Sequence, residues 1–107
     1  MNLRFKPNIL IVWTQTNLAI AEAFCQACRE IVGEAYVPTL TSGMDGQHSA
    51  ESGHYYGRAL DFRSHDLPDD ETLRQGIKTR VGVILGDRYL CLLEPTHFHI
   101  QRQRNSF

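Results

Sequence analysis

Residues 58–63 read Arg-Ala-Leu-Asp-Phe-Arg, and they carry the clearest strand pattern in the chain. Ala59 and Asp61 alternate with Leu60 and Phe62, which is the two-residue period of a β-strand. Asp61 stands where an apolar or β-branched residue is expected on the inner face of a sheet. Because an unpaired buried charge is strongly unfavourable, this carboxylate needs a partner, and a metal ion is one such partner.

Two helices are predicted, one before and one after this strand in the sequence. Residues 17–32 repeat apolar side chains at helical spacing, with Asn17 as the expected N-cap and Gly33 as the expected C′ residue. The apolar face is expected to hold Leu18, Ala21, Cys25, Cys28 and Val32, widened by Ile20, Phe24 and Ile31. The second helix is expected to begin in the Leu-Pro-Asp-Asp-Glu run at 67–71 and to continue to about residue 81.

The remaining segments complete an α+β pattern. Residues 35–41 are predicted to form a short edge strand interrupted by Pro38, and residues 42–57 a long polar loop of the kind that is often functional. Residues 89–93 and 97–100 look like a terminal hairpin. We therefore expect one small domain over residues 1–107, with an antiparallel sheet and helices packed on it.

Composition narrows the possible functions. The chain has 107 residues, enough for one core, and its 11 Lys and Arg against 12 Asp and Glu give a net charge of −1. This balance argues against a nucleic-acid-binding protein. No apolar run is long enough to span a membrane and no signal peptide is evident, so synthesis and folding in the cytoplasm are expected. Cys25 and Cys28 are expected to pack in the core, because a second cysteine pair for a metal site is missing.

The histidines suggest a metal site. His54 precedes Asp61 by seven positions, and His97 and His99 are two apart on a predicted strand, so both project from one face. His54, Asp61 and one of the two later histidines would provide two nitrogens and one carboxylate. That donor set is the one found in catalytic zinc sites, which keep a fourth position for water.

The same residues carry a family resemblance. Residues 52–61 read Ser-Gly-His-Tyr-Tyr-Gly-Arg-Ala-Leu-Asp, which resembles the S-x-H-x-x-G-x-A-x-D signature of the zinc D-alanyl-D-alanine carboxypeptidase family. The His-Phe-His at 97–99 is similar to the H-x-H motif of that group. The wider group includes bacteriophage endolysin peptidases, lysostaphin-like enzymes and the hedgehog signalling domain. Short phage and prophage members look most like the whole chain.

The resemblance implies a hedgehog/DD-peptidase-like fold with one Zn²⁺ per chain. Its ligands would be His54, Asp61 and His99, and His97 would stand beside the metal as the catalytic base. In relatives with a single histidine here, an acidic residue three positions earlier is the base. Glu94 stands at that distance, so the alternative assignment makes His97 the ligand and Glu94 the base.

The implied activity is hydrolysis of peptide bonds in bacterial peptidoglycan by a metal-activated water, with stem or cross-link peptides as substrates. Carboxypeptidase relatives commonly carry an arginine before the signature, whereas residues 42–45 read Ser-Gly-Met-Asp, which favours an endopeptidase. A phage-type enzyme would act at the cell wall after release from the cytoplasm. The alternative is a catalytically silent, zinc-bearing binding module of the same fold.

Overall fold

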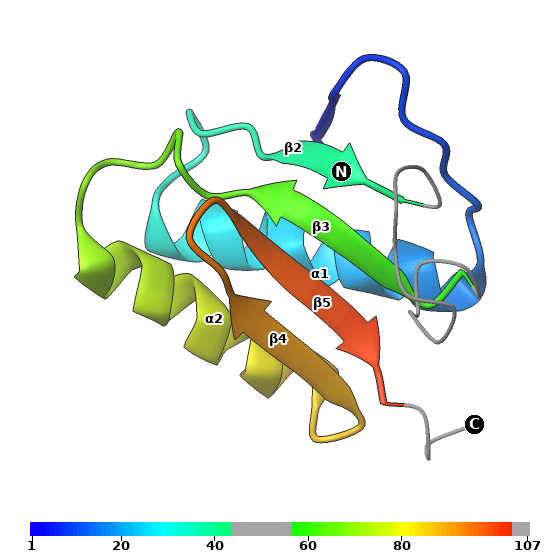
Figure 1. Ribbon diagram of the computed structural model, residues 1–107. Helices are drawn as coiled ribbons and strands as arrows, with labels where there is room; N and C mark the ends of the chain where they lie inside the picture. Colours follow the sequence, from blue (N-terminus) through cyan, green and yellow to red (C-terminus); the bar gives the residue numbers. More distant parts are fainter. Residues whose placement is uncertain (44–56, 104–107) are drawn as a thin grey trace.

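The structure, a computed structural model, describes residues 1–43 and 57–103. Within these ranges the chain forms a five-stranded sheet with two helices on one side of it (Figure 1). The strands are β1 (Arg4–Phe5), β2 (Thr39–Ser42), β3 (Ala59–Arg63), β4 (Tyr89–Leu93) and β5 (His97–Arg102); the helices are α1 (Gln15–Ile31) and α2 (Glu71–Leu85). The α+β class is therefore confirmed.

Helix α1 begins earlier than its apolar pattern suggests. Thr14 is the N-cap, and its hydroxyl oxygen accepts a hydrogen bond from the Asn17 backbone N–H at 3.0 Å. Asn17, the predicted cap, is instead buried inside the helix, where its side-chain amide donates to the Val12 carbonyl at 2.8 Å. Leu18 is 42% exposed and does not belong to the buried face. At the other end Gly33 follows the C-cap with φ +124°, so the predicted glycine stop is confirmed.

Helix α2 is capped by Asp70, whose carboxylate accepts from the Thr72 backbone N–H at 2.9 Å. It runs to Leu85, four residues beyond the predicted end, and stops at Gly86 with φ +84°. A turn after Gly86 leads into β4. Neither helix in the described part of the chain is long and apolar enough to cross a bilayer.

The sheet order is β1-β2-β3-β5-β4, and two predictions about it are wrong. The sheet is mixed rather than antiparallel, because β1 pairs with β2 in parallel. Consequently β2 lies between β1 and β3 instead of at an edge. Pro38 precedes β2, and its carbonyl accepts from the Arg4 backbone N–H at 2.8 Å, so the proline starts the parallel pairing without interrupting it. The β4–β5 hairpin is confirmed.

Three phenylalanines join the helix layer to the sheet. Phe24 of α1 stacks on Phe62 of β3, with ring centroids 4.2 Å apart, and packs against Phe98 of β5 at 5.1 Å. All three side chains are fully buried. Cys25 and Cys28 are free thiols buried on the same helix, which confirms their packing role. Burial raises the pKa of the Cys28 thiol above its usual range and lowers its reactivity.

Candidate metal centre

The two faces of the sheet carry different kinds of side chain, because successive residues of β3 and β5 point to opposite faces. Phe62 and Phe98 point toward the helices and enter the core. Their neighbours in sequence therefore point to the opposite face, which neither helix covers (Figure 1). Asp61 on β3 lies directly opposite His99 on β5, and Arg63 lies opposite His97. The register thus brings three of the predicted site residues onto the face of the sheet opposite the helices.

Asp61 and His99 form a direct side-chain pair. His99 Nδ1 lies 2.8 Å from Asp61 Oδ1, and the two side chains are 17% and 12% exposed. The Asp61 carboxylate, for which the sequence predicts a partner, therefore contacts an imidazole on the neighbouring strand β5. A carboxylate oxygen and an imidazole nitrogen are both zinc donors, so this pair fits the predicted metal on its donor chemistry.

Several groups act on the pKa of His99. Burial lowers it, but hydrogen bonds to Asp61 and Gln101 and the negative charges of Asp61 and Glu94 raise it by more. The net pKa therefore lies above the ordinary value of 6.5. Because a metal needs the deprotonated nitrogen, a proton on His99 competes with metal binding, and this competition grows as the pH falls.

His97 lies beside this pair and is more open to solvent. Its Nε2 is 3.9 Å from Asp61 Oδ2, its side chain is 33% exposed, and its Nδ1 is 3.2 Å from Thr96 Oγ1. At 3.9 Å there is no direct hydrogen bond to the carboxylate. His99 thus has the tighter contact with Asp61, and His97 has the access to water that a base requires.

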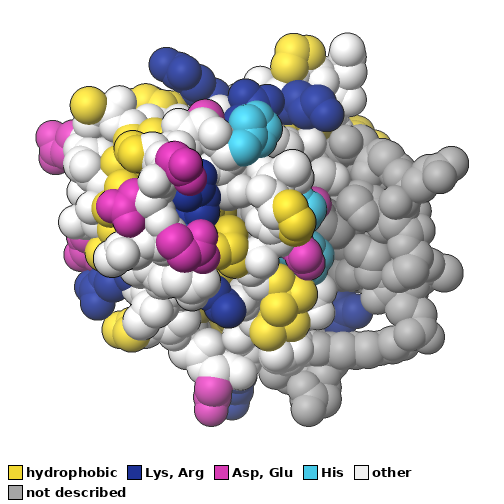
Figure 2. Space-filling view, turned by 60° about the vertical axis from the view of Figure 1, so that its left-hand side comes forward, with side chains coloured by type: hydrophobic (Ala, Val, Ile, Leu, Met, Phe, Trp, Pro, Cys, Tyr) yellow, Lys and Arg dark blue, Asp and Glu magenta, His cyan; other side chains and the backbone are white. Residues whose placement is uncertain are grey.

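Glu94 is in the turn that leads into β5. Its backbone N–H donates to the His97 carbonyl at 2.8 Å, which ties the turn to the strand. Its side chain helps to line a groove beside the start of α2 that does not include Asp61 or His99. Figure 2, which brings this side forward, shows acidic side chains around a basic one; among the groove residues, Asp69, Glu71 and Glu94 are acidic and Arg74 is basic.

His54, the first predicted ligand, lies outside the described residues. In the two described ranges no group of three His, Cys, Asp or Glu side chains is placed to hold a metal ion. The residues that flank the segment 44–56 contact one short part of the chain. The Thr14 hydroxyl donates to the Gly57 carbonyl, and Gly43 packs against Leu10 and Ile11. A side chain at Gly57, where φ is +68°, would also meet Thr14 Cγ2 at 2.7 Å.

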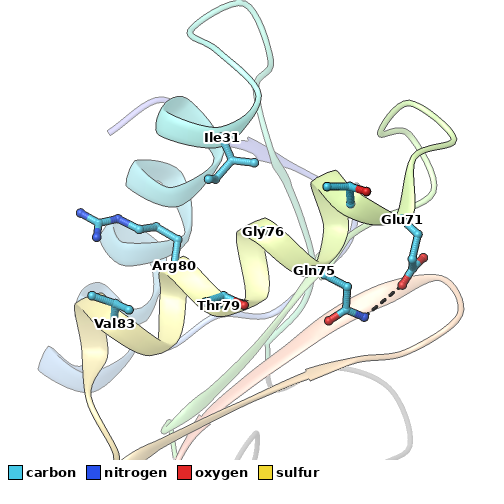
Figure 3. Close-up of a pocket in the computed structure, with 8 residues that line it drawn as sticks. Ile31, Glu71, Gln75, Gly76, Thr79, Arg80 and Val83 are labelled. Carbon is cyan, nitrogen blue, oxygen red and sulfur yellow. Dashed lines mark hydrogen bonds between the residues drawn. The ribbon is translucent and has the colours of Figure 1, made fainter.

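Another groove lies in the helix layer, on the other side of the sheet from Asp61 (Figure 3). Gly76 lets α2 approach Ile31 of α1 closely there, since a Cβ at Gly76 would lie 3.3 Å from Ile31 Cγ2. The charged residues of the groove have partners, since Glu71 accepts from Gln75 at 3.0 Å and Arg80 pairs with Glu30 at 2.6 Å. The Asp61–His99 pair, with His97 beside it, lies on the opposite face of the sheet and is the candidate site that combines a carboxylate with two imidazoles.

One residue of the site was missed at the level of sequence. Gln101 Oε1 lies 2.8 Å from His99 Nε2, on the side of the ring that faces away from Asp61. The signal was present, because residues two apart on a strand share a face. Arg58 is buried next to this strand pair, with its carbonyl accepting from the Arg102 backbone N–H at 3.0 Å.

Comparisons with protein-family models, with curated proteins and with solved structures find no match to this chain.

Proposed function

We propose that this protein is a zinc-dependent peptidase that hydrolyses peptide bonds in bacterial peptidoglycan. The observation that carries the proposal is the contact between Asp61 and His99, with His97 beside it on the face of the sheet opposite the helices. These are three of the residues that the resemblance to zinc D-alanyl-D-alanine carboxypeptidases and phage endolysins singles out. The hedgehog/DD-peptidase-like fold belongs to this proposal and rests on the same resemblance.

In this proposal Asp61, His99 and His54 hold the metal. Bound zinc would supply a water of lowered pKa and a positive charge for the oxygen of the scissile carbonyl. Asp61 would offset part of the metal's charge. His97, whose side chain is 33% exposed, would take a proton from water and return it to the leaving amine. Without an arginine in residues 42–45, cleavage within stem or cross-link peptides is favoured over removal of a terminal residue.

The activity is tested by mass spectrometry of fragments released from purified peptidoglycan. We expect the protein to release defined peptides, the release to stop when a chelator removes the metal, and added Zn²⁺ to restore it. The fragment masses would also identify the bond. No release from several wall types, by protein that circular dichroism shows to be folded, would contradict the enzyme and favour a zinc-bearing binding module.

His97→Ala separates the two assignments of the catalytic base. With His99 as ligand, we expect this variant to bind Zn²⁺ with nearly unchanged affinity and to lose hydrolysis by about 10²–10⁴-fold, the usual contribution of a general base. Zinc affinity is measured by competition with a chromophoric chelator. Loss of zinc binding in His97→Ala would instead make His97 the ligand and Glu94 the base, and Glu94→Gln would then be the variant that keeps zinc and loses activity.

A further inference from the structure

The two ring nitrogens of His99 have different partners. Nδ1 lies 2.8 Å from Asp61 Oδ1, and Nε2 lies 2.8 Å from Gln101 Oε1. The ring is thus held between a carboxylate on the neighbouring strand and an amide on its own strand. Gln101 lies on the same face of β5 as His99, two residues further along, and opposite Ala59 of β3.

This arrangement distinguishes the nitrogens as metal ligands. The nitrogens of an imidazole ring point in divergent directions, so a cation shared with Asp61 is reached from Nδ1. The opposite nitrogen, Nε2, keeps its proton when Nδ1 binds a metal, and that N–H then needs an acceptor. Gln101 Oε1 is an acceptor at hydrogen-bond distance from it.

We propose that Gln101 is a positioning residue that accepts the Nε2–H of His99 and so presents Nδ1 of the ring to the metal. This inference rests on the proposed function, since it assumes that Asp61 and His99 share a metal ion. Hydrogen bonds of this kind fix the ring orientation and tautomer of metal-binding histidines. The opposite amide orientation, with the Gln101 NH₂ group donating to Nε2, would leave the ring proton on Nδ1 and block the metal there.

The test compares Gln101→Leu, which removes the acceptor, with Gln101→Glu, which keeps one. We expect Gln101→Leu to lower the affinity for Zn²⁺ by about 10–100-fold, the usual loss for a residue that orients a ligand. Gln101→Glu should restore most of that affinity. Gln103→Leu is the matched control, because Gln103 lies two residues beyond Gln101 and its backbone N–H donates to the Arg88 carbonyl. The Zn²⁺ affinity of this variant should equal that of the wild type.

The tautomer is read directly from long-range ¹H–¹⁵N spectra of the histidine side chains. In the zinc-loaded wild type we expect His99 to be protonated at Nε2 and metal-bound at Nδ1, and circular dichroism checks that each variant is folded. Zinc binding through Nε2, or unchanged affinity in Gln101→Leu while Asp61→Asn loses zinc, would overturn only the role of Gln101. A wild-type protein that binds no Zn²⁺ would overturn the proposed function and this inference together.

Discussion

Asp61→Asn is expected to remove most of the zinc binding and almost all of the hydrolytic activity. The asparagine has nearly the same shape, and its side-chain oxygen can take the place of Asp61 Oδ1, which lies 2.8 Å from His99 Nδ1 in the wild type. It lacks the negative charge that a divalent cation needs. We expect zinc affinity to fall by at least ~100-fold, beyond the range for a residue outside the ligand set.

Hydrolysis by Asp61→Asn should fall by about 10³-fold or more, because the metal's contribution to catalysis is several kcal/mol and each ~1.4 kcal/mol is a factor of ten. Zinc affinity is measured by chelator competition and activity by peptide release from peptidoglycan. Asp87→Asn, in the exposed turn before β4, removes the same charge far from β3 and should change neither quantity. Equal zinc affinity in Asp61→Asn and Asp87→Asn would exclude Asp61 as a ligand.

The largest effect on stability is expected for Phe24→Ala. Phe24 is fully buried, and its ring contacts Phe62 and Phe98, which lie on the two strands that carry the site. Removal of the ring leaves a cavity between α1 and the sheet. Such a change typically lowers the free energy of unfolding by about 3–5 kcal/mol. Because small domains are stable by only about 5–15 kcal/mol, Phe24→Ala should leave a marginally stable protein.

Leu18→Ala is the matched control for Phe24→Ala, since it shortens an apolar side chain on the same helix at a position that is 42% exposed. Surface changes of this kind usually alter stability by about 0.5 kcal/mol or less. Urea unfolding followed by far-ultraviolet circular dichroism gives both values. Similar losses in the two variants would mean that Phe24 does not anchor the helix to the sheet.

Three residues of the candidate site stand out in the sequence because of local patterns. Asp61 was conspicuous as a carboxylate in an apolar strand, and His97 and His99 share a face because residues two apart on a strand always do. The contact between Asp61 and His99 could not be derived in this way. It depends on the register of β3 against β5, and a shift of one residue would have placed the core residue Phe98 opposite Asp61.

The strands of the sheet, too, could be predicted from local patterns only where they do not depend on pairing with a distant segment. The strand at 59–63, both helices and the terminal hairpin followed from periodicity and turn residues, and all four are present. Strand β1 could not be predicted, because two residues are too few to show an alternating pattern and the strand forms only by pairing with β2. The Thr14 cap was missed for a related reason: the apolar pattern starts inside the helix, whereas the cap depends on one hydrogen bond.

Local sequence was therefore sufficient for both helices, most of the strands and the α+β class, and it singled out the residues that we propose to bind a metal. Those properties arise from neighbours in the chain, whose spacing fixes which side chains share a face. Only the tertiary structure decided the position of β2 within the sheet, the pairing of Asp61 with His99 and the contact of His99 with Gln101. These depend on strand register and side-chain orientation, which are set when α1 and α2 pack on one face of the sheet.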